Sequence, residues 1–193
     1  MRLRSWNLNL LDPTPYFEAV FRAPWEGSGG MERPRDRGDG KLADARLVAT
    51  LESKPLPEVI RDINKFSNNV MARQVLLTLA RLESDQPATA AAGAANLRAF
   101  LAEQGLEMPE LVLENGLACR ATSASPASLA ALLAQARRSP LAPEFIASLP
   151  LAGIDGTARR RAVAAGYAHI KTGMLDGVRA IAGIVQARGA ATT

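Results

Sequence analysis

A long helical run that breaks once constrains the fold of this chain more than any other feature. Apolar side chains recur at helical spacing from residue 59 to residue 79. The break is Ser67-Asn68-Asn69, three poor helix formers in a row, which is typical of one helix ending and another beginning with a new N-cap. We therefore predict two helices, over 57–66 and about 69–82, with Ser67 and Asn69 at the joint.

Weaker signals predict the remaining elements. Residues 16–23 have helical spacing, and Pro24 is expected to stop that helix. Further helices are predicted over 88–104, with Gly105 as its C-terminal cap, over 126–138, with Ser125 as its N-cap, and over 143–149. Extended segments are predicted at 47–51 and 111–113. A hairpin is predicted to pair 169–172 with 178–186 through a turn at Asp176-Gly177.

Composition narrows the class of protein. With 193 residues and 48% hydrophobic content, the chain can bury a globular core. A single cysteine, Cys119, excludes an internal disulfide, and with only one histidine a structural zinc site is not expected, so we predict no metal and no cofactor. The net charge of +4 is spread along the chain without interleaved aromatic residues, and we therefore predict no nucleic-acid partner.

Composition also divides the chain. Residues 27–40 are rich in glycine and arginine, and we expect 1–45 to be the remnant of an inserted or preceding region, with the main domain in 46–193. The first residues contain no apolar signal sequence, and no apolar run approaches the roughly 20 residues of a membrane span. As encoded, the chain is expected to be cytoplasmic and to have no membrane span.

The triplet Lys171-Thr172-Gly173, on a predicted strand, supplies the second constraint. Its lysine can attract a substrate carboxylate, its hydroxyl can hydrogen-bond that group, and its glycine lets a substrate backbone lie close to the strand. Taken alone, Lys171-Thr172-Gly173 is better explained as a lysine before a turn, and Ser67-Asn68-Asn69 as a helix cap. The two triplets together, in this order, are more informative.

Four segments carry a specific resemblance to a known family. They are 64–74 (NKFSNNVMARQ), 111–116 (LVLENG), 149–161 (LPLAGIDGTARRR) and 169–183 (HIKTGMLDGVRAIAG). In these segments the chain resembles low-molecular-mass class C penicillin-binding proteins, the serine-type D-Ala-D-Ala carboxypeptidases and endopeptidases of peptidase type S13. The resemblance runs from about residue 12 to about residue 186. It implies an α+β fold, a partial transpeptidase-like domain with helices packed on an antiparallel sheet and incomplete at both ends.

The resemblance also implies a role for each motif residue. Ser67 would shuttle a proton toward the leaving group, Asn69 would orient the substrate and the active-site lysine, and Lys171 would complete the electrostatics of the site. Thr172 and Gly173 would line the substrate strand. The backbone N–H of Met174 would form half of an oxyanion hole.

The sequence departs from the family pattern at three places. The family's nucleophilic motif, Ser-x-x-Lys, does not occur in these 193 residues. The segment after Asn115-Gly116 reads Leu-Ala-Cys-Arg instead of a serine- and glycine-containing stretch, and Met174 stands where a threonine is common. Cys119 is interpreted as a buried or incidental thiol, and His169 as a packing or substrate-flanking residue instead of a general base.

The leading hypothesis is a fragment of a peptidoglycan-metabolising D-Ala-D-Ala carboxypeptidase that is inactive alone. Its ligands would be D-Ala-D-Ala-ended peptides or β-lactams, and its parent family is periplasmic. A second hypothesis is a non-catalytic module that binds such peptides or a partner protein. A decayed gene product and a charge-driven RNA-binding protein are the third and fourth.

Overall fold

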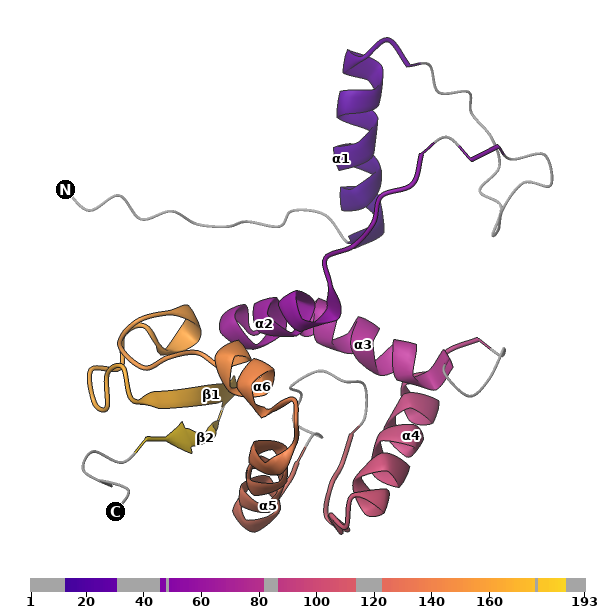
Figure 1. The fold of residues 1–193 in the computed structure, drawn as a ribbon. Coiled ribbons are helices and arrows are strands. Elements are labelled where there is room, and N and C mark those ends of the chain that lie inside the picture. Colours follow the sequence, from indigo (N-terminus) through magenta and orange to yellow (C-terminus); the bar gives the residue numbers. More distant parts are fainter. Residues whose placement is uncertain are drawn as a thin grey trace. The chain divides into compact units, whose positions relative to one another are not determined.

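The computed structural model describes residues 13–30, 46–47, 49–81, 87–113, 123–175 and 177–186. The chain divides into two compact units, Met1–Thr50 and Leu51–Thr193 (Figure 1). The first unit contains one described helix, and the second contains the remaining helices and a small antiparallel sheet. The predicted nature of residues 1–45, a remnant of an inserted or preceding region, stays a prediction.

The first unit contains helix α1 (Pro13–Gly27), which is longer than the sequence predicted. The expectation that Pro24 stops the helix is wrong. Proline lacks an N–H, but the carbonyl of Pro24 still accepts a hydrogen bond from the N–H of Ser28 at 3.0 Å, so the last turn closes beyond it. The rings of Phe17, Phe21 and Trp25 stack in succession one helical turn apart, with centroid distances of 6.5 and 6.1 Å.

The predicted strand at 47–51 is also wrong for the residues that the structure describes. Residues 47, 49, 50 and 51 have no strand conformation, and the side chains of Leu47 and Leu51 are exposed. A short apolar run needs a neighbouring strand to satisfy its backbone, and the described part of the chain pairs none with it.

The second unit begins with the two helices predicted around the triplet, α2 (Leu56–Phe66) and α3 (Asn69–Arg81). Ser67 ends α2 in the left-handed conformation, with φ of 53°, and its N–H donates to the carbonyl of Ile63. The side chain of Asn68 then caps α3, because its Oδ1 accepts the N–H of Met71 at 3.0 Å. The predicted joint is therefore confirmed, with the middle residue of the triplet as the cap.

Helix α4 (Ala90–Glu103) packs against α3 at very short range. Thr89 caps its start by accepting the N–H of Ala92, and Gly105, with φ of 72°, follows its end. A Cβ on Gly93 would lie 2.2 Å from the backbone oxygen of Leu76, so glycine is required at this crossing. The buried face of α3 carries Leu76 and Ala80.

Helices α5 (Pro126–Arg138) and α6 (Ala142–Ser148) follow as the sequence predicted. Ser125 caps α5 by accepting the N–H of Ser128 at 3.1 Å. The extended segment predicted at 111–113 makes one isolated bridge, between Val112 and Ser123.

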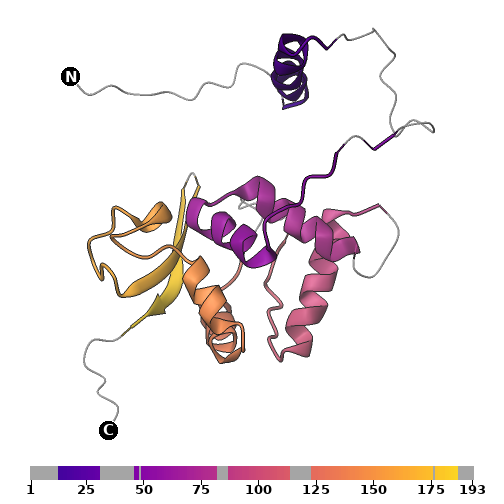
Figure 2. The ribbon, with the colours of Figure 1, turned by 45° about the horizontal axis from the view of Figure 1, so that its top comes forward.

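The sheet of the second unit consists of strands β1 (Ala168–Leu175) and β2 (Val178–Val185), which pair antiparallel (Figure 2). Lys171 lies opposite Ala182, and Ile170 lies opposite Gly183. The first half of β1 also bonds to residues 150–152 on its other edge: the N–H of Ile170 donates to the carbonyl of Pro150 at 2.8 Å. The predicted hairpin and the α+β fold class are confirmed.

A small core lies where β1 meets the loop before it. It consists of Ala152, Ala158, Ala168 and Ile170, with Ala158 at the end of the 3₁₀ helix η1 (Gly156–Ala158). This helix contacts both α2 and β1, so it links the helix that ends at Ser67 to the strand that carries Lys171. Within the described residues, no helix is long and apolar enough to cross a membrane.

Candidate functional site

The two motif triplets, 104 positions apart in sequence, meet in the second unit. The ammonium group of Lys171 donates a hydrogen bond to Ser67 Oγ at 2.5 Å and another to the carbonyl of Thr172 at 2.8 Å. Ser67 stands in the left-handed turn that ends α2, and its side chain meets β1 through this bond. Since Ser67 Oγ accepts from Lys171, its own hydroxyl proton remains available to another acceptor.

Lys171 is a half-buried cation, and both oxygens that accept its hydrogen bonds among the described residues are neutral. Burial lowers its pKa from the ordinary lysine value, because desolvation disfavours the charged form. No ion pair joins it to a carboxylate in the part of the chain that the structure describes. An ammonium group has three donors, and the described residues accept two of them, which leaves the third for an incoming anion as far as this part of the chain is concerned.

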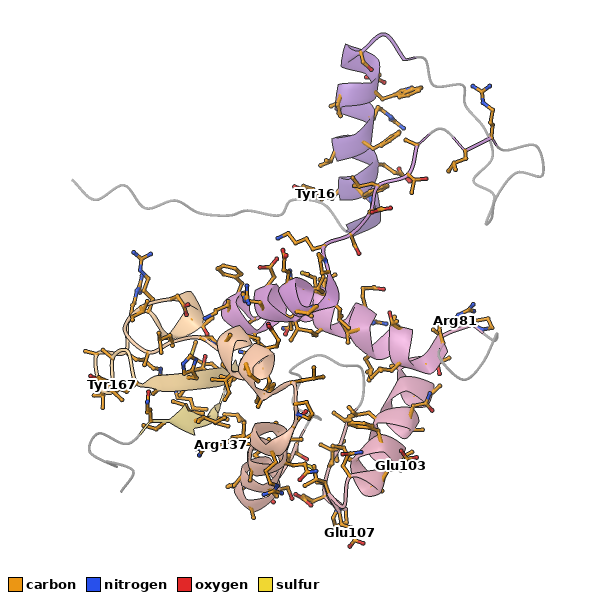
Figure 3. The ribbon with its side chains drawn as sticks, in the orientation of Figure 1. Tyr16, Arg81, Glu103, Glu107, Arg137 and Tyr167 are labelled. Carbon is orange, nitrogen blue, oxygen red and sulfur yellow. The ribbon has the colours of Figure 1, made fainter. Side chains whose placement is uncertain are left out.

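The free part of the β1 edge is set by the hydrogen-bond pattern of the strand. Tyr167, labelled in Figure 3, is the residue just before β1, and its carbonyl accepts the N–H of Gln186. Bonded pairs alternate along an antiparallel ladder, so the odd-numbered residues of β1 exchange backbone hydrogen bonds with β2. The backbone of the even-numbered residues faces the opposite edge. Residues 150–152 cover that edge at Ala168 and Ile170, and Thr172 and Met174 lie beyond them.

The other predicted site residues differ in how closely they approach Lys171. Thr172 Oγ1 donates to Thr157 Oγ1 at 3.3 Å, which ties the triplet to η1. Met174 is 78% exposed. Asn69 is the first residue of α3 and is exposed, and no hydrogen bond of its side chain joins it to the described residues. The structure therefore brings Ser67, Lys171 and Thr172 together, and it places Asn69 nearby in sequence without a contact to Lys171.

Gly173 differs from the glycines that the fold requires. A Cβ built on Gly183, on the neighbouring strand, would lie 2.1 Å from the backbone oxygen of His169, whereas a Cβ on Gly173 would lie 3.7 Å from the Cβ of Ala180, an ordinary contact. Packing therefore does not demand a glycine at position 173. The sequence-based expectation, that a glycine here admits a ligand backbone, gives a separate reason for it.

We predict that Gly173→Ala leaves stability unchanged or slightly higher and weakens the binding of an extended peptide at the β1 edge. Alanine loses less backbone entropy on folding than glycine, by about 0.5–1 kcal/mol. Thermal unfolding and peptide titration of the same sample measure the two effects. Gly183→Ala is the matched control and should lower the unfolding temperature instead. A Gly173→Ala chain that binds peptide as tightly as the wild type would contradict the assignment.

A second polar cluster lies beside the site, and sequence analysis did not assign it. Lys65 Nζ donates to Asp155 Oδ2 at 2.6 Å and to the carbonyl of Leu149 at 2.8 Å, and the N–H of Leu151 donates to Asp155 Oδ1 at 2.7 Å. Next to it, Asn64 Nδ2 donates to Ser148 Oγ at 2.8 Å. The sequence did contain one signal for this cluster: Asn64 and Lys65 stand between the apolar residues Ile63 and Phe66, where a buried polar group needs a partner.

The charge state of Asp155 follows from its partners. Burial acts to raise its pKa, but the hydrogen bond from Lys65 and the N–H of Leu151, with the charge of Lys65 and of His169, outweigh it and hold the pKa below the ordinary value. The Lys65 side chain is 14% exposed and that of Asp155 is 41% exposed. The cluster is therefore an ion pair between a largely buried lysine of α2 and a partly exposed aspartate of the loop that precedes β1.

Other candidates from the sequence lie elsewhere. Cys119 and the turn at residues 114–116 fall outside the described residues. His169 is half-buried, and its Nδ1 is buried with no hydrogen-bond partner among the described residues, which fits a packing role. The described residues contain no cluster of three or more histidine, cysteine or acidic side chains that could hold a metal ion.

Helices beside an antiparallel strand pair, with Ser-x-Asn and Lys-Thr-Gly residues in contact, define the class of penicillin-binding and β-lactamase-like acyl-transfer folds. A model of the D-Ala-D-Ala carboxypeptidase 3 (S13) family matches residues 3–192, and the chain belongs to this family.

Curated relatives agree with the family. The chain is 32% identical over 151 residues to a D-alanyl-D-alanine carboxypeptidase of Actinomadura sp., covering 74% of this chain and 28% of that protein. It is 27% identical over 156 residues to the D-alanyl-D-alanine carboxypeptidase DacB of Haemophilus influenzae, covering 77% of this chain and 33% of the relative. The chain thus spans at most about a third of these relatives.

Solved structures agree with the fold. The crystal structure of penicillin binding protein 4 from Haemophilus influenzae superposes with a TM-score of 0.79 at 23% identity, covering 92% of this chain and 41% of that one. The same protein in complex with a β-lactam superposes with a TM-score of 0.77, covering 42% of its chain.

Proposed function

We propose that this chain binds the carboxylate end of a D-Ala-D-Ala-terminated peptidoglycan peptide, as the corresponding part of a serine-type D-Ala-D-Ala carboxypeptidase would. The observation that carries the proposal is Lys171, a half-buried cation with an unused donor and no carboxylate partner in the described part of the chain. Holding a desolvated cation without a counter-ion lowers stability, and such groups gather where a charged ligand binds.

The ligand would lie along the uncovered part of the β1 edge. An extended peptide can add to a strand edge through backbone hydrogen bonds, and Thr172 and Met174 direct their backbone groups to that edge. The terminal carboxylate would meet Lys171, Thr172 and Gly173 would line the peptide backbone, and the N–H of Met174 would donate to the carbonyl of the scissile bond.

The same residues define what part of the reaction this chain can serve. Ser67, bonded to Lys171, would pass a proton toward the leaving group, and Asn69 would orient the peptide from the start of α3. The acyl-enzyme step needs the nucleophilic serine of a Ser-x-x-Lys motif, which these 193 residues do not contain. The chain alone is therefore proposed to bind the ligand without cleaving it. β-Lactams, which carry a carboxylate beside their reactive amide, are expected to occupy the same edge.

Titration with a D-Ala-D-Ala-ended tripeptide tests this function. We expect saturable binding that weakens about tenfold or more in Lys171→Met, because a charge-assisted hydrogen bond contributes about 1.5–3 kcal/mol. The same peptide with an amidated C-terminus should bind the wild type as weakly as the acid binds the variant. Lys54→Met, which removes an exposed lysine that pairs with Asp62 on α2, is the matched control. Equal binding of the acid and the amide would contradict the proposal.

A further inference from the structure

We propose that Lys65 and Asp155 are positioning residues, a clamp that holds Ser67 against Lys171. This inference rests on the proposed function for its purpose, because the Ser67–Lys171 contact matters only if the site receives a ligand. The clamp is defined here as the Lys65 ammonium group, the Asp155 carboxylate and the two backbone groups they bond, the carbonyl of Leu149 and the N–H of Leu151.

The first step of the argument is that the clamp fixes the end of α2. Lys65 is the last residue but one of the helix, and Ser67 follows two positions later. The Lys65 ammonium group reaches past the helix to two acceptors of the 149–155 loop, at 2.8 and 2.6 Å. An ammonium group held by a carbonyl and a carboxylate on the same loop restrains the helix end in more than one direction.

The second step is that the loop is fixed to β1. The N–H of Ile170 donates to the carbonyl of Pro150 at 2.8 Å, and the N–H of Ala152 donates to the carbonyl of Ala168 at 2.9 Å. Leu151, whose N–H bonds to Asp155, itself forms a bridge with His169. Residues 150–152 therefore pair with β1 like a short additional strand just before Lys171. Because of these bonds, the loop and β1 are expected to move together.

The third step is that the backbone of α2 and the 149–155 loop, which continues into η1, approach each other closely at Gly156. Gly156 has a φ of 53°, and a Cβ on it would lie 2.5 Å from the backbone oxygen of Lys65. Only a residue without a side chain allows this approach. This contact places the first residue of η1 against the backbone of Lys65, two positions before Ser67.

Together these contacts form a closed frame from Ser67 through Lys65, Asp155 and β1 to Lys171. The direct contact between Ser67 and Lys171 is a single hydrogen bond at a half-buried position. A single hydrogen bond from a charged group contributes about 1.5–3 kcal/mol net, and one such contact does not by itself fix the relative position of two elements. The frame as a whole fixes the end of α2 relative to β1, and it thereby keeps Ser67 in contact with the ammonium group of Lys171.

The Lys171 ammonium group reports whether the frame is intact. The chain has four lysines, Lys41, Lys54, Lys65 and Lys171, so each can be followed by NMR after 13C labelling at Cε. We expect Asp155→Asn to raise the measured pKa of Lys171, because a displaced Ser67 turn lets water reach the ammonium group. Direct loss of a nearby negative charge would lower that pKa, so the sign of the shift separates movement from electrostatics.

The variants separate loss of the Lys65–Asp155 ion pair from displacement of the loop and from a change of charge alone. The amide introduced by Asp155→Asn still offers its Oδ1 to the N–H of Leu151, so only the ion pair with Lys65 is removed. Gly156→Ala is a second variant that pushes the loop from α2 without any change of charge, and it should raise the Lys171 pKa as well. Lys54→Met breaks the other lysine–aspartate pair of α2, at 2.9 Å on its exposed side, and should leave the Lys171 pKa unchanged.

The outcomes are distinct. A rise of the Lys171 pKa in folded Asp155→Asn and Gly156→Ala, with none in Lys54→Met, supports the clamp. A Lys171 pKa that is unchanged or lower in either folded variant overturns it. Peptide titration of the same samples reports separately on the function: a wild type that binds no D-Ala-D-Ala peptide overturns the proposed function, while the Lys171 shift still decides the clamp.

Discussion

Incubation of the folded 193-residue chain with a fluorescent penicillin is expected to leave no covalent band on a denaturing gel. Penicillin acylates the serine of a Ser-x-x-Lys motif, and this motif does not occur in the sequence. The loss of the nucleophile from a serine acyl-transfer site costs about 10⁶-fold in rate. Ser67 is not expected to replace it, because its oxygen accepts a hydrogen bond from a charged lysine, which makes it less nucleophilic.

The controls distinguish a missing nucleophile from an unfolded chain. Circular dichroism of the same sample should show the helices α2 to α6, and penicillin binding protein 4 from Haemophilus influenzae, a structural relative, should label under identical conditions. A labelled band from this chain would refute the prediction. Ser67→Ala and Cys119→Ala would then show which side chain was acylated.

Local sequence signals predicted much of this fold because local physics decides those features. Ser67-Asn68-Asn69 breaks the helix whatever surrounds it, since its backbone preferences and caps act within about four residues. Ser125 before Pro126 starts α5, and Gly177, with φ of 78°, supports the hairpin turn for the same reason. The resemblance assigned Ser67 and Lys171 to one site, but their direct contact was not predicted, because it joins residues 104 positions apart.

The features that sequence reasoning missed depend on tertiary context. The Lys65–Asp155 pair joins positions 90 residues apart, and no spacing rule connects them. Phe66 on α2 and Val70 on α3, members of the apolar repeat, are exposed, whereas Leu76 and Ala80 are buried, and Leu76 lies where Gly93 of α4 meets α3. Pro24 failed as a stop signal because a proline near a helix end removes one donor and leaves its carbonyl to close the final turn.

Replacement of Lys65 by methionine is expected to lower the free energy of unfolding by about 2 kcal/mol near neutral pH. The change leaves the Asp155 carboxylate and the carbonyl of Leu149 without the donor they share. Removal of one partner of a fully buried ion pair costs about 3–5 kcal/mol. The Asp155 side chain is 41% exposed, so solvent screens part of that loss and a smaller value applies here.

The dependence on pH identifies the ion pair as the cause. Burial opposes ionisation of Asp155, but its bonds to Lys65 and Leu151 hold its pKa below the ordinary 3.8. A carboxyl group whose pKa is lower in the folded state stabilises the fold above its unfolded pKa, and this stability is lost as the pH falls through the folded pKa. The difference between wild type and Lys65→Met should therefore shrink from neutral pH to below the ordinary pKa of aspartate.

Chemical denaturation at several pH values measures this difference, with Lys171→Met as the matched lysine variant. Burial lowers the pKa of Lys171, so its charged form destabilises the fold below that pKa and the cost is relieved as the pH rises above it. Near neutral pH, Lys171→Met should therefore be as stable as the wild type or more stable, the opposite of Lys65→Met. A stability loss in Lys65→Met that stays constant across the acid range would mean that lost packing of the lysine stem causes it. Two lysines close to the same serine are thus expected to act with opposite sign: Lys65 stabilises the frame, and Lys171 is held at a cost that a bound carboxylate would offset.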